Sequence, residues 1–367
     1  MRRVLIVLGV GFVLFIGYFL LWPVPIDPVA WEAPPNPGYT GQFAVNQQLA
    51  ALERVEVPGL TGPEDLAFDP EGTIYTTSHE GWIARRVPGS DTFEAWVDTD
   101  GRPLGVDWDA AGDRLVVADA FRGLMAVDRA GRLTLLTDEA DGIPIRYADD
   151  VVAAADGTLY FSDASVKFGA EDWGGTYPAS MPDIFEHAGH GRILAYDPVS
   201  GHTSVLMEGL VFANGVALTP GDAALLVVET GSYRVHLHHL RGARAGTTEV
   251  LLDNLPGYPD NLARGEDGRY WVGLVSERRG IVDNLAPRPF WRRVVQRLPD
   301  AVRPEATRYG HVAAFTLNGE IVMSLQDPSG DFARTTGAFE AEGGLWITSL
   351  HEPDLGWLPI AMPSGGS

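Results

Sequence analysis

The sequence predicts an all-β protein: a six-bladed β-propeller of four-stranded antiparallel blades, preceded by an N-terminal transmembrane helix. Three observations favour it: a hairpin pattern occurs six times, its copies are spaced at about one blade's length, and the N-terminus is a long apolar run. The chain has 367 residues, of which 45% are apolar. That is enough apolar material for the core of one large β domain.

The N-terminal apolar run covers residues 4–22, "VLIVLGVGFVLFIGYFLLW", and follows Arg2 and Arg3. A bilayer span needs about 20 apolar residues, and basic residues before a first span keep the N-terminus in the cytoplasm. We therefore expect residues 1–22 to be a single-pass anchor, with the propeller on the periplasmic or extracytoplasmic side. A cleaved signal peptide is the alternative, although no A-x-A-like site follows the run. The Pro-rich residues 23–49 predict an extended linker.

The repeated pattern is a β-hairpin with a Gly at its bend, as in "DDVVAAADGTLYFSD". Its six copies begin at Glu64, Leu104, Asp149, Asn214, Asp260 and Thr336. A blade needs about 40–45 residues, and the longer spacings contain insertions at residues 168–191 and 277–311. We assign residues 50–367 to the propeller. The segment "LERVEVPG" from Leu52 is predicted to pair into the last blade and close the ring.

The first positions of the six copies predict a metal site. In a propeller the innermost strands line the central channel, so these positions form a ring. Glu64, Asp149, Asn214 and Asp260 carry oxygens in that ring, and three converging carboxylates repel unless a cation joins them. Because the chain has no cysteine, oxygen ligation favours Ca²⁺, with Mg²⁺ or Mn²⁺ as alternatives. The competing interpretation is that each residue only forms a side-chain turn at the start of a strand.

Other aspartates have simpler expected roles. Asp65 and Asp150 adjoin proposed ligands and either support them or act as turn residues. Asp69, Asp107 and Asp109 are expected to be turn residues near hairpin bends.

The histidines form two groups. Three isolated ones could carry protons in catalysis, although a lone histidine is more often structural: His79, His187 and His190. Three more alternate along a strand in "YRVHLHHL", where zinc binding is conceivable and solvent exposure is expected: His236, His238 and His239.

Several phrases, among them "YADDVVAAADGTLYFSDASVKF", "FANGVALTPGDAALLVVETGSYR" and "LPGYPDNLARGEDGRYWVG", closely resemble the strictosidine synthase-like family. The resemblance extends to the adipocyte plasma membrane-associated protein-like members, including their N-terminal anchor. It places the chain within the gluconolactonase–paraoxonase group of six-bladed propellers.

In the hydrolases of that group, the resemblance implies a channel Ca²⁺ held by a Glu, Asn residues and an Asp. These roles fall on Glu64, Asn214 and Asp260. Asp149 departs from the family, which has Asn there, and the extra charge should tighten a divalent cation. The acid/base Glu of the plant condensing enzyme falls on Thr336, which cannot take a proton, so that condensation is disfavoured.

Two functions from different classes remain open. The first is a Ca²⁺-dependent hydrolase of lactones or aryl esters, in which Asp260, Asp149 and Asn214 act in catalysis beside the metal. The second is a non-catalytic binding or scaffold propeller with a structural metal. The net charge of −22 argues against nucleic-acid binding, and no GxSxG serine-hydrolase elbow is present.

The second insertion contains a basic amphipathic segment, residues 288–303, "RPFWRRVVQRLPDAVR". Such a segment either rests on a membrane surface through its arginines or packs on the propeller and turns them toward the acidic body. The N-terminal anchor favours the membrane surface. The arginines are Arg288, Arg292, Arg293, Arg297 and Arg303.

Overall fold

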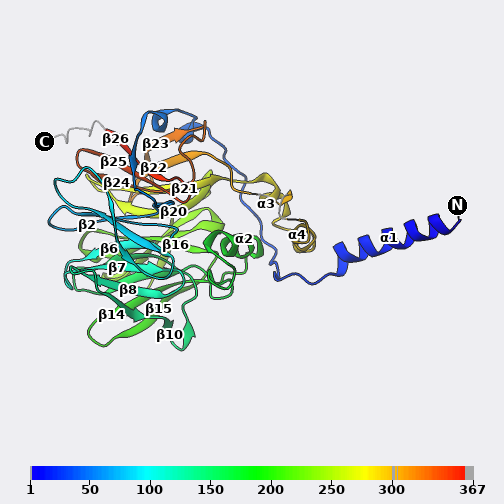
Figure 1. The fold of residues 1–367 in the computed structure, drawn as a ribbon, viewed down its shortest axis with the longest axis horizontal. Coiled ribbons are helices and arrows are strands. Elements are labelled where there is room, and N and C mark those ends of the chain that lie inside the picture. Colours follow the sequence, from blue (N-terminus) through cyan, green and yellow to red (C-terminus); the bar gives the residue numbers. More distant parts are fainter. Residues whose placement is uncertain (1, 300–301, 304, 360–367) are drawn as a thin grey trace.

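A computed structural model describes residues 2–299, 302–303 and 305–359, and confirms the six-bladed β-propeller. Within these residues, six four-stranded antiparallel sheets form the blades, and there is a small two-stranded sheet, β10–β11 (Figure 1). The terminal residues 360–367 of the expected propeller lie outside the described range.

In five blades the four strands follow one another in sequence, because each strand returns antiparallel beside the one before it, and the sixth blade adds β1 to three consecutive strands. The inner strands are β2 (Leu66–Phe68), β6 (Pro103–Asp109), β12 (Ala148–Ala153), β16 (Ala213–Leu218), β20 (Gly257–Arg264) and β24 (Thr335–Ala341). The second strands are β3 (Ile74–Thr77), β7 (Arg114–Asp119), β13 (Leu159–Asp163), β17 (Ala224–Glu229), β21 (Arg269–Glu277) and β25 (Gly344–Ser349).

The two outer positions of each blade are filled in the same order. The third strands are β4 (Trp82–Arg86), β8 (Gly123–Asp128), β14 (Gly191–Asp197), β18 (Arg234–His239), β22 (Gly310–Thr316) and β26 (Asp354–Pro359). The outermost strands are β5 (Glu94–Asp98), β9 (Leu133–Thr137), β15 (His202–Leu210), β19 (Thr248–Leu252), β23 (Ile321–Asp327) and β1 (Glu53–Glu56), and the small sheet pairs β10 (Glu139–Ala140) with β11 (Ile143–Pro144).

The predicted closure of the ring is confirmed. Strand β1 pairs antiparallel with β26, with Glu53 opposite Trp357 and Glu56 opposite Asp354. The first and last parts of the propeller therefore share one sheet, which removes the open edge that β26 would otherwise present.

The core lies mainly between neighbouring blades. One cluster packs Tyr75 and Ile83 of the first blade against Val106, Leu115 and Val117 of the second. Because strand side chains alternate between the two faces, each blade can contact both of its neighbours. This packing fixes the blades radially and therefore fixes the inner strands around the channel.

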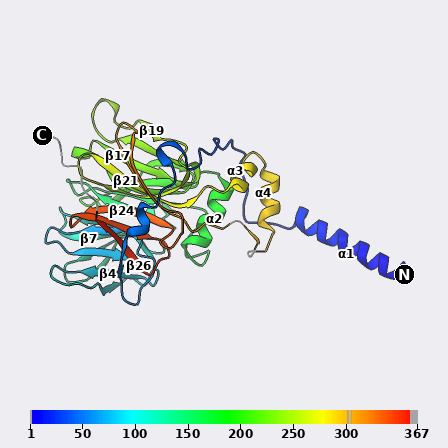
Figure 2. The same ribbon diagram turned by 90° about the horizontal axis from the view of Figure 1, so that it is seen from above.

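Four helices lie at one end of the molecule (Figures 1 and 2). They are α1 (Arg2–Leu21), α2 (Thr176–Glu186), α3 (Gly280–Leu285) and α4 (Pro289–Gln296). Among the described residues, α1 is the one helix long and apolar enough to cross a membrane, and none of its residues is buried. It is therefore a possible signal anchor.

The Pro-rich segment after α1 is extended but packs against the propeller. The backbone N–H of Val29 donates to the Glu186 carbonyl at 2.9 Å, and the Trp31 ring stacks on His187 at a centroid distance of 3.8 Å. Two short 3₁₀ turns, Gly41–Phe43 and Gln48–Ala51, follow and bury Phe43 and Leu49. The segment thus forms a strap across the end of the molecule that carries α2.

Candidate functional site

The predicted ring of polar residues converges on the channel. One carboxylate oxygen from each of Glu64, Asp149 and Asp260 lies within 4.8 Å of the others, and all three side chains are buried. Among the described residues, this is the one cluster of three or more His, Cys, Asp or Glu side chains with such a geometry. Oxygen atoms so placed fit a hard divalent cation.

A β-bulge gives the ring positions their orientation. In five blades, the pairing between the inner and second strands shifts register across the two residues that begin the repeat, as from Ala148 to Val151 and from Ala213 to Val216. In the first blade, pairing begins at Leu66, two residues after Glu64. Bulges re-aim side chains next to functional sites, so a local backbone device repeats around the channel.

Asn214 lies in the same pocket and contacts Asp260. Burial and nearby Glu64 raise the pKa of Asp260, and a hydrogen bond from the Asn214 side chain partly offsets this. Among the described residues, neither Oδ1 of Asn214 nor Oδ1 of Asp260 has a hydrogen-bond partner, and both are buried. Buried polar atoms without partners are rare and indicate an ion or water at that position. The residues present therefore fit a bound cation.

The carboxyl groups of the site favour protonation when no cation is present. Burial is the main cause, and it raises the pKa of Asp149 well above its ordinary value, with further increases from Glu64 and Asp260. Burial also raises the pKa of Glu64, and Arg102 opposes that rise. A divalent cation would reverse this preference, because it stabilises the ionised form.

Arg102 is a site residue that the sequence analysis did not identify. Its Nη2 donates to Glu64 Oε2 at 2.8 Å, and its Nη1 donates to the carbonyls of Ser78 and Pro103. The guanidinium is buried, so the pair is shielded from water. The site therefore combines three carboxylates with one fixed cation. Its only sequence signal was a basic residue two positions before the ring residue Leu104.

The two remaining ring positions, Leu104 and Thr336, carry no charged group that could bind a cation. Leu104 is apolar, and its carbonyl accepts a hydrogen bond from Thr77 Oγ1 at 2.8 Å. Thr336 Oγ1 donates to the Glu64 carbonyl at 2.7 Å and contacts Thr348 Oγ1 at 2.8 Å. Thr336 thus joins the last blade to the first.

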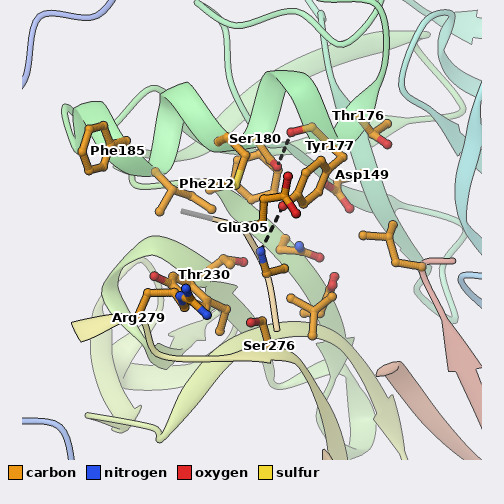
Figure 3. A pocket seen from close by; sticks show the side chains of 18 of the residues that line it. Asp149, Thr176, Tyr177, Ser180, Phe185, Phe212, Thr230, Ser276, Arg279 and Glu305 are labelled. Atoms are coloured by element: carbon orange, nitrogen blue, oxygen red, sulfur yellow. Dashed lines mark hydrogen bonds between the residues drawn. The ribbon is translucent and has the colours of Figure 1, made fainter. Parts of the chain in front are cut away.

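A pocket opens above the carboxylates and has a volume of about 860 Å³ when its open mouth is included. Helix α2 forms one side, with Tyr177 and Ser180 labelled there, and Arg279 and Ser276 lie across from it (Figure 3). The wall is largely apolar: Met181, Ile184, Phe185, Phe212, Val275 and Val282. An apolar pocket with a polar base is a common form of small-molecule site.

The aspartates next to the ring bridge neighbouring blades. Asp65 accepts hydrogen bonds from the N–H groups of Leu66 and Val106, and Asp150 accepts from Val151 and Val216. Their role is therefore to support the inner strands through hydrogen bonds across each blade junction.

The prediction for Asp107 was wrong. Its carboxylate is not at a hairpin bend but within β6, where it accepts N–H groups from Trp108 and from Ala153 of the next blade. Burial raises its pKa to about 6. Asp69 and Asp109 do act at bends, where they accept the N–H groups of Thr73 and Gly112.

The three isolated histidines lie outside the pocket lining. His79 Nε2 is 2.5 Å from the Leu350 carbonyl, and His190 Nε2 is 2.7 Å from Glu186 Oε1. His187 ends α2 in a left-handed conformation and stacks on Trp31. These contacts give them structural roles.

The exposure expected for the histidines of β18 was also wrong. All three are buried, because β18 is an interior strand of its blade, covered by β17 and β19. Their partners are Glu229 for His236, Thr248 for His238 and Glu249 for His239. Each ring thus contacts a different residue.

The basic segment 288–303 includes residues 300 and 301, which lie outside the described range. Within the described part, Arg292 is 1% exposed, and its guanidinium donates to the carbonyls of Phe185, Glu186 and Ala286. Arg297 is also buried. These two arginines therefore face protein and cannot meet lipid headgroups, contrary to the membrane-facing interpretation.

Two family profiles match the chain. The family described as "Strictosidine synthase-like, N-terminal" matches residues 41–86, and the family described as "Strictosidine synthase" matches residues 149–243.

The chain is similar to three curated relatives along most of its length. It is 38% identical to strictosidine synthase-like 4 of Arabidopsis thaliana over 236 residues. This alignment covers 62% of this chain and 60% of the relative. It is 35% identical over 281 residues to strictosidine synthase-like 6 of the same plant, covering 75% and 71%. It is 30% identical over 379 residues to the adipocyte plasma membrane-associated protein of Salmo salar, and this alignment covers 96% of this chain and 89% of the relative.

Solved structures share the fold. A gluconolactonase from Xanthomonas campestris aligns with a TM-score of 0.62 and 19% identity, over 92% of this chain and 99% of that one. The calcium-binding protein regucalcin from Agrobacterium tumefaciens aligns with a TM-score of 0.58 and 19% identity, over 84% and 93%. Both alignments support the propeller assignment.

Proposed function

The chain belongs to the strictosidine synthase-like family, and from that premise we propose that it is a Ca²⁺-dependent hydrolase of lactones or aryl esters. The observation that carries the proposal is the cluster of Glu64, Asp149 and Asp260 at the base of an apolar pocket. The names of two structural neighbours, a gluconolactonase and a calcium-binding protein, are consistent with this chemistry.

The four ring residues Glu64, Asp149, Asn214 and Asp260 would hold the ion. When bound, Ca²⁺ would supply Lewis-acid polarisation of the ester carbonyl and stabilise the charge that develops on its oxygen. Asn214 orients Asp260 through their hydrogen bond. The apolar wall and α2 would hold the acyl or aryl group and exclude water from the base of the pocket.

Proton transfer falls to the carboxylates of the site. Asp149 and Asp260 both line the pocket, and both have raised pKa values because they are buried. With a cation bound, these carboxyl groups would be ionised, so either could take a proton from an attacking water. Direct attack by one of these carboxylates is the alternative route.

One observation favours the second candidate, a binding propeller with a structural metal. Glu64 already pairs with Arg102, which reduces the negative charge left for an open, reactive metal position. Condensation of the strictosidine synthase type is less well supported, because the Thr336 hydroxyl bonds to the backbone and carries no acid or base.

We also propose that α1 remains attached as an anchor, with the N-terminus in the cytoplasm and the propeller on the opposite side. The supporting observations are the length and apolarity of α1 and the placement of Arg2 and Arg3 at its start.

The test is hydrolysis of phenyl acetate and simple lactones by the full chain in detergent. We expect a chelator to abolish the rate and Ca²⁺ to restore it, and Asp260→Asn to reduce the rate by at least about 100-fold, since even changes outside the first ligand sphere cost up to that much. Asp138→Asn, at an exposed position, is the matched control and should keep the full rate. No rate above buffer across esters and lactones would favour the binding protein.

A further inference from the structure

The second insertion is joined directly to the end of α1. Nε of Arg297, just after α4, donates to the Trp22 carbonyl at 2.6 Å, and its Nη1 donates to the Phe19 carbonyl at 3.0 Å. In return, the Tyr18 hydroxyl donates to the Arg297 carbonyl at 3.1 Å. A helix leaves its last carbonyls without partners, and a cation there also complements the helix dipole. Arg297 therefore caps α1.

This contact fixes where α4 lies relative to a membrane. Helix α1 has 20 residues, which at 1.5 Å per residue is about 30 Å, the thickness of a bilayer's hydrocarbon core. If α1 spans the bilayer, its capped end lies at the interface. Helix α4 then lies at the same level, because one arginine side chain links the two helices.

The outward side of α4 is aromatic. Phe290 is 47% exposed and Trp291 is 53% exposed, with their ring centroids 5.4 Å apart. Of the next two residues, Arg292 is buried against the end of α2, whereas Arg293 is half-exposed and pairs with Asp27 of the strap. The surface of α4 that is left exposed thus combines two large aromatic rings with Arg288 and Arg293 beside them.

We propose that α4 is an interfacial membrane-contact helix, in which Phe290 and Trp291 enter the headgroup–acyl boundary of the bilayer that α1 spans. Aromatic side chains prefer that depth, because the ring is buried among acyl chains while its polar edge stays near water and headgroups. The contact rests mainly on apolar burial of the two rings, because Arg292 and Arg297 are themselves buried in protein. It holds the end of the propeller that carries α2 toward the lipid surface (Figures 1 and 2), and residues of α2 line the pocket. It depends on α1 as a span and is independent of the proposed hydrolysis.

The absence of cysteine from the chain permits a direct depth measurement. Full-length Trp291→Cys, labelled with the fluorophore NBD, is reconstituted in phosphatidylcholine vesicles that carry doxyl quenchers near the headgroup or at mid-chain. Phe12→Cys in the middle of α1 is the deep reference, and Val199→Cys, at a position 94% exposed in the loop after β14, is the aqueous reference. Circular dichroism confirms that each variant is folded.

We expect the label at position 291 to show blue-shifted emission and to lose fluorescence most with the shallow quencher. The label at position 12 should lose most with the deep quencher, and the label at position 199 should respond to neither. Raising the salt concentration should leave most of the quenching at 291, since the buried rings and not the exposed Arg288 and Arg293 are its main basis. Quenching at 291 no greater than at 199, or its disappearance at high salt, would overturn the proposal.

Discussion

Arg102 sets the charge balance of the carboxylate site. With three carboxylates and one guanidinium, the ionised cluster retains two negative charges, which a single divalent cation neutralises. Without Arg102 the same ring would carry one more uncompensated charge in a buried position. The arginine therefore makes the extra carboxylate of Asp149 tolerable, where the resemblance led us to expect an amide.

His311 lies in β22 and is not one of the site residues. It makes a pH-dependent contribution to the stability of the fold. Burial lowers its pKa from the ordinary 6.5 to about 3. The folded state thus holds the neutral ring, and protonation favours unfolding. The stabilising contribution is complete above pH 6.5 and is lost as the pH falls from 6.5 toward 3, by roughly 1.4 kcal/mol per pH unit.

We expect His311→Gln to flatten the fall of the thermal midpoint between pH 6.5 and 4, even if the variant is less stable at every pH. Thermal unfolding in detergent followed by intrinsic fluorescence measures this slope. His202→Gln replaces an exposed histidine and should leave the slope unchanged. Equal slopes for both variants would contradict a buried, neutral His311.

At the scale of elements, the hairpins were predictable and the contacts of the insertions were not. Alternating strands and a Gly at each bend are local signals, so the starts of the inner strands could be placed from the sequence. The side chains of an amphipathic insertion can face lipid or protein with the same pattern. Arg292 illustrates the difference, because three of the four carbonyls that it meets come from α2 and the strap, which are distant in sequence, and the fourth belongs to Ala286 just after α3.

Arg292 joins the strap to the wall of the pocket, and its removal should loosen α2. Arg292→Leu removes the donor to the Phe185 carbonyl at the end of α2, at a cost of about 1–3 kcal/mol, while the Glu186 carbonyl keeps the Val29 N–H. Hydrogen–deuterium exchange should then increase across residues 176–187 and the thermal midpoint should fall. Arg293→Leu, on the same helix but half-exposed and paired only with Asp27, is the matched control. Similar exchange of α2 in both variants would show that the strap does not hold this wall.

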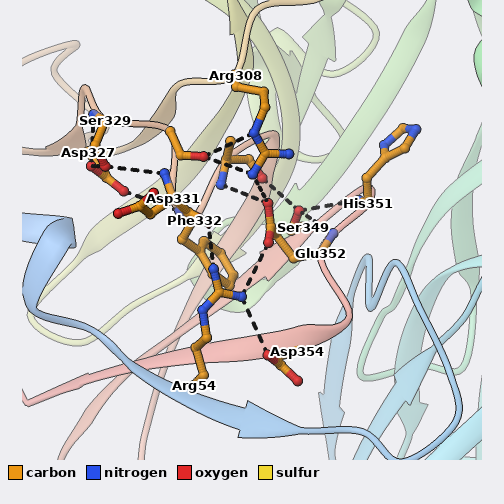
Figure 4. Close-up of polar contacts among 12 residues, drawn as sticks. Arg54, Arg308, Asp327, Ser329, Asp331, Phe332, Ser349, His351, Glu352 and Asp354 are labelled. Atoms are coloured by element: carbon orange, nitrogen blue, oxygen red, sulfur yellow. Dashed lines mark hydrogen bonds and ion pairs between the residues drawn. The ribbon is translucent and has the colours of Figure 1, made fainter.

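At the scale of the whole molecule, closure of the ring brings distant segments into one network. Figure 4 shows Arg54 of β1 and Arg308 reaching Glu352, with Arg54 also contacting Asp354 of β26. The pairing of β1 was predictable because a propeller must cover its last edge. The ring of Glu64, Asp149, Asn214 and Asp260 was predictable from the repeat itself, because equivalent positions of the six copies meet around the channel.

Features outside the repeat required the structure. Arg102 lies in a loop between blades, and the histidines of β18 are buried because β17 and β19 cover that strand. Neither fact follows from local periodicity, since each depends on which neighbour covers the side chain.

The most direct test of the account is the metal content of the purified full chain, measured by plasma mass spectrometry after desalting into chelator-free buffer. We predict one Ca²⁺ per chain, none in Asp260→Ala, and a full equivalent in the exposed control Asp138→Ala. Added Ca²⁺ should raise the thermal midpoint of the chelator-treated wild-type chain, because an ion bound only to the folded state stabilises it. A wild-type chain without any divalent ion, or an Asp260→Ala chain that keeps a full equivalent, would contradict the proposed site.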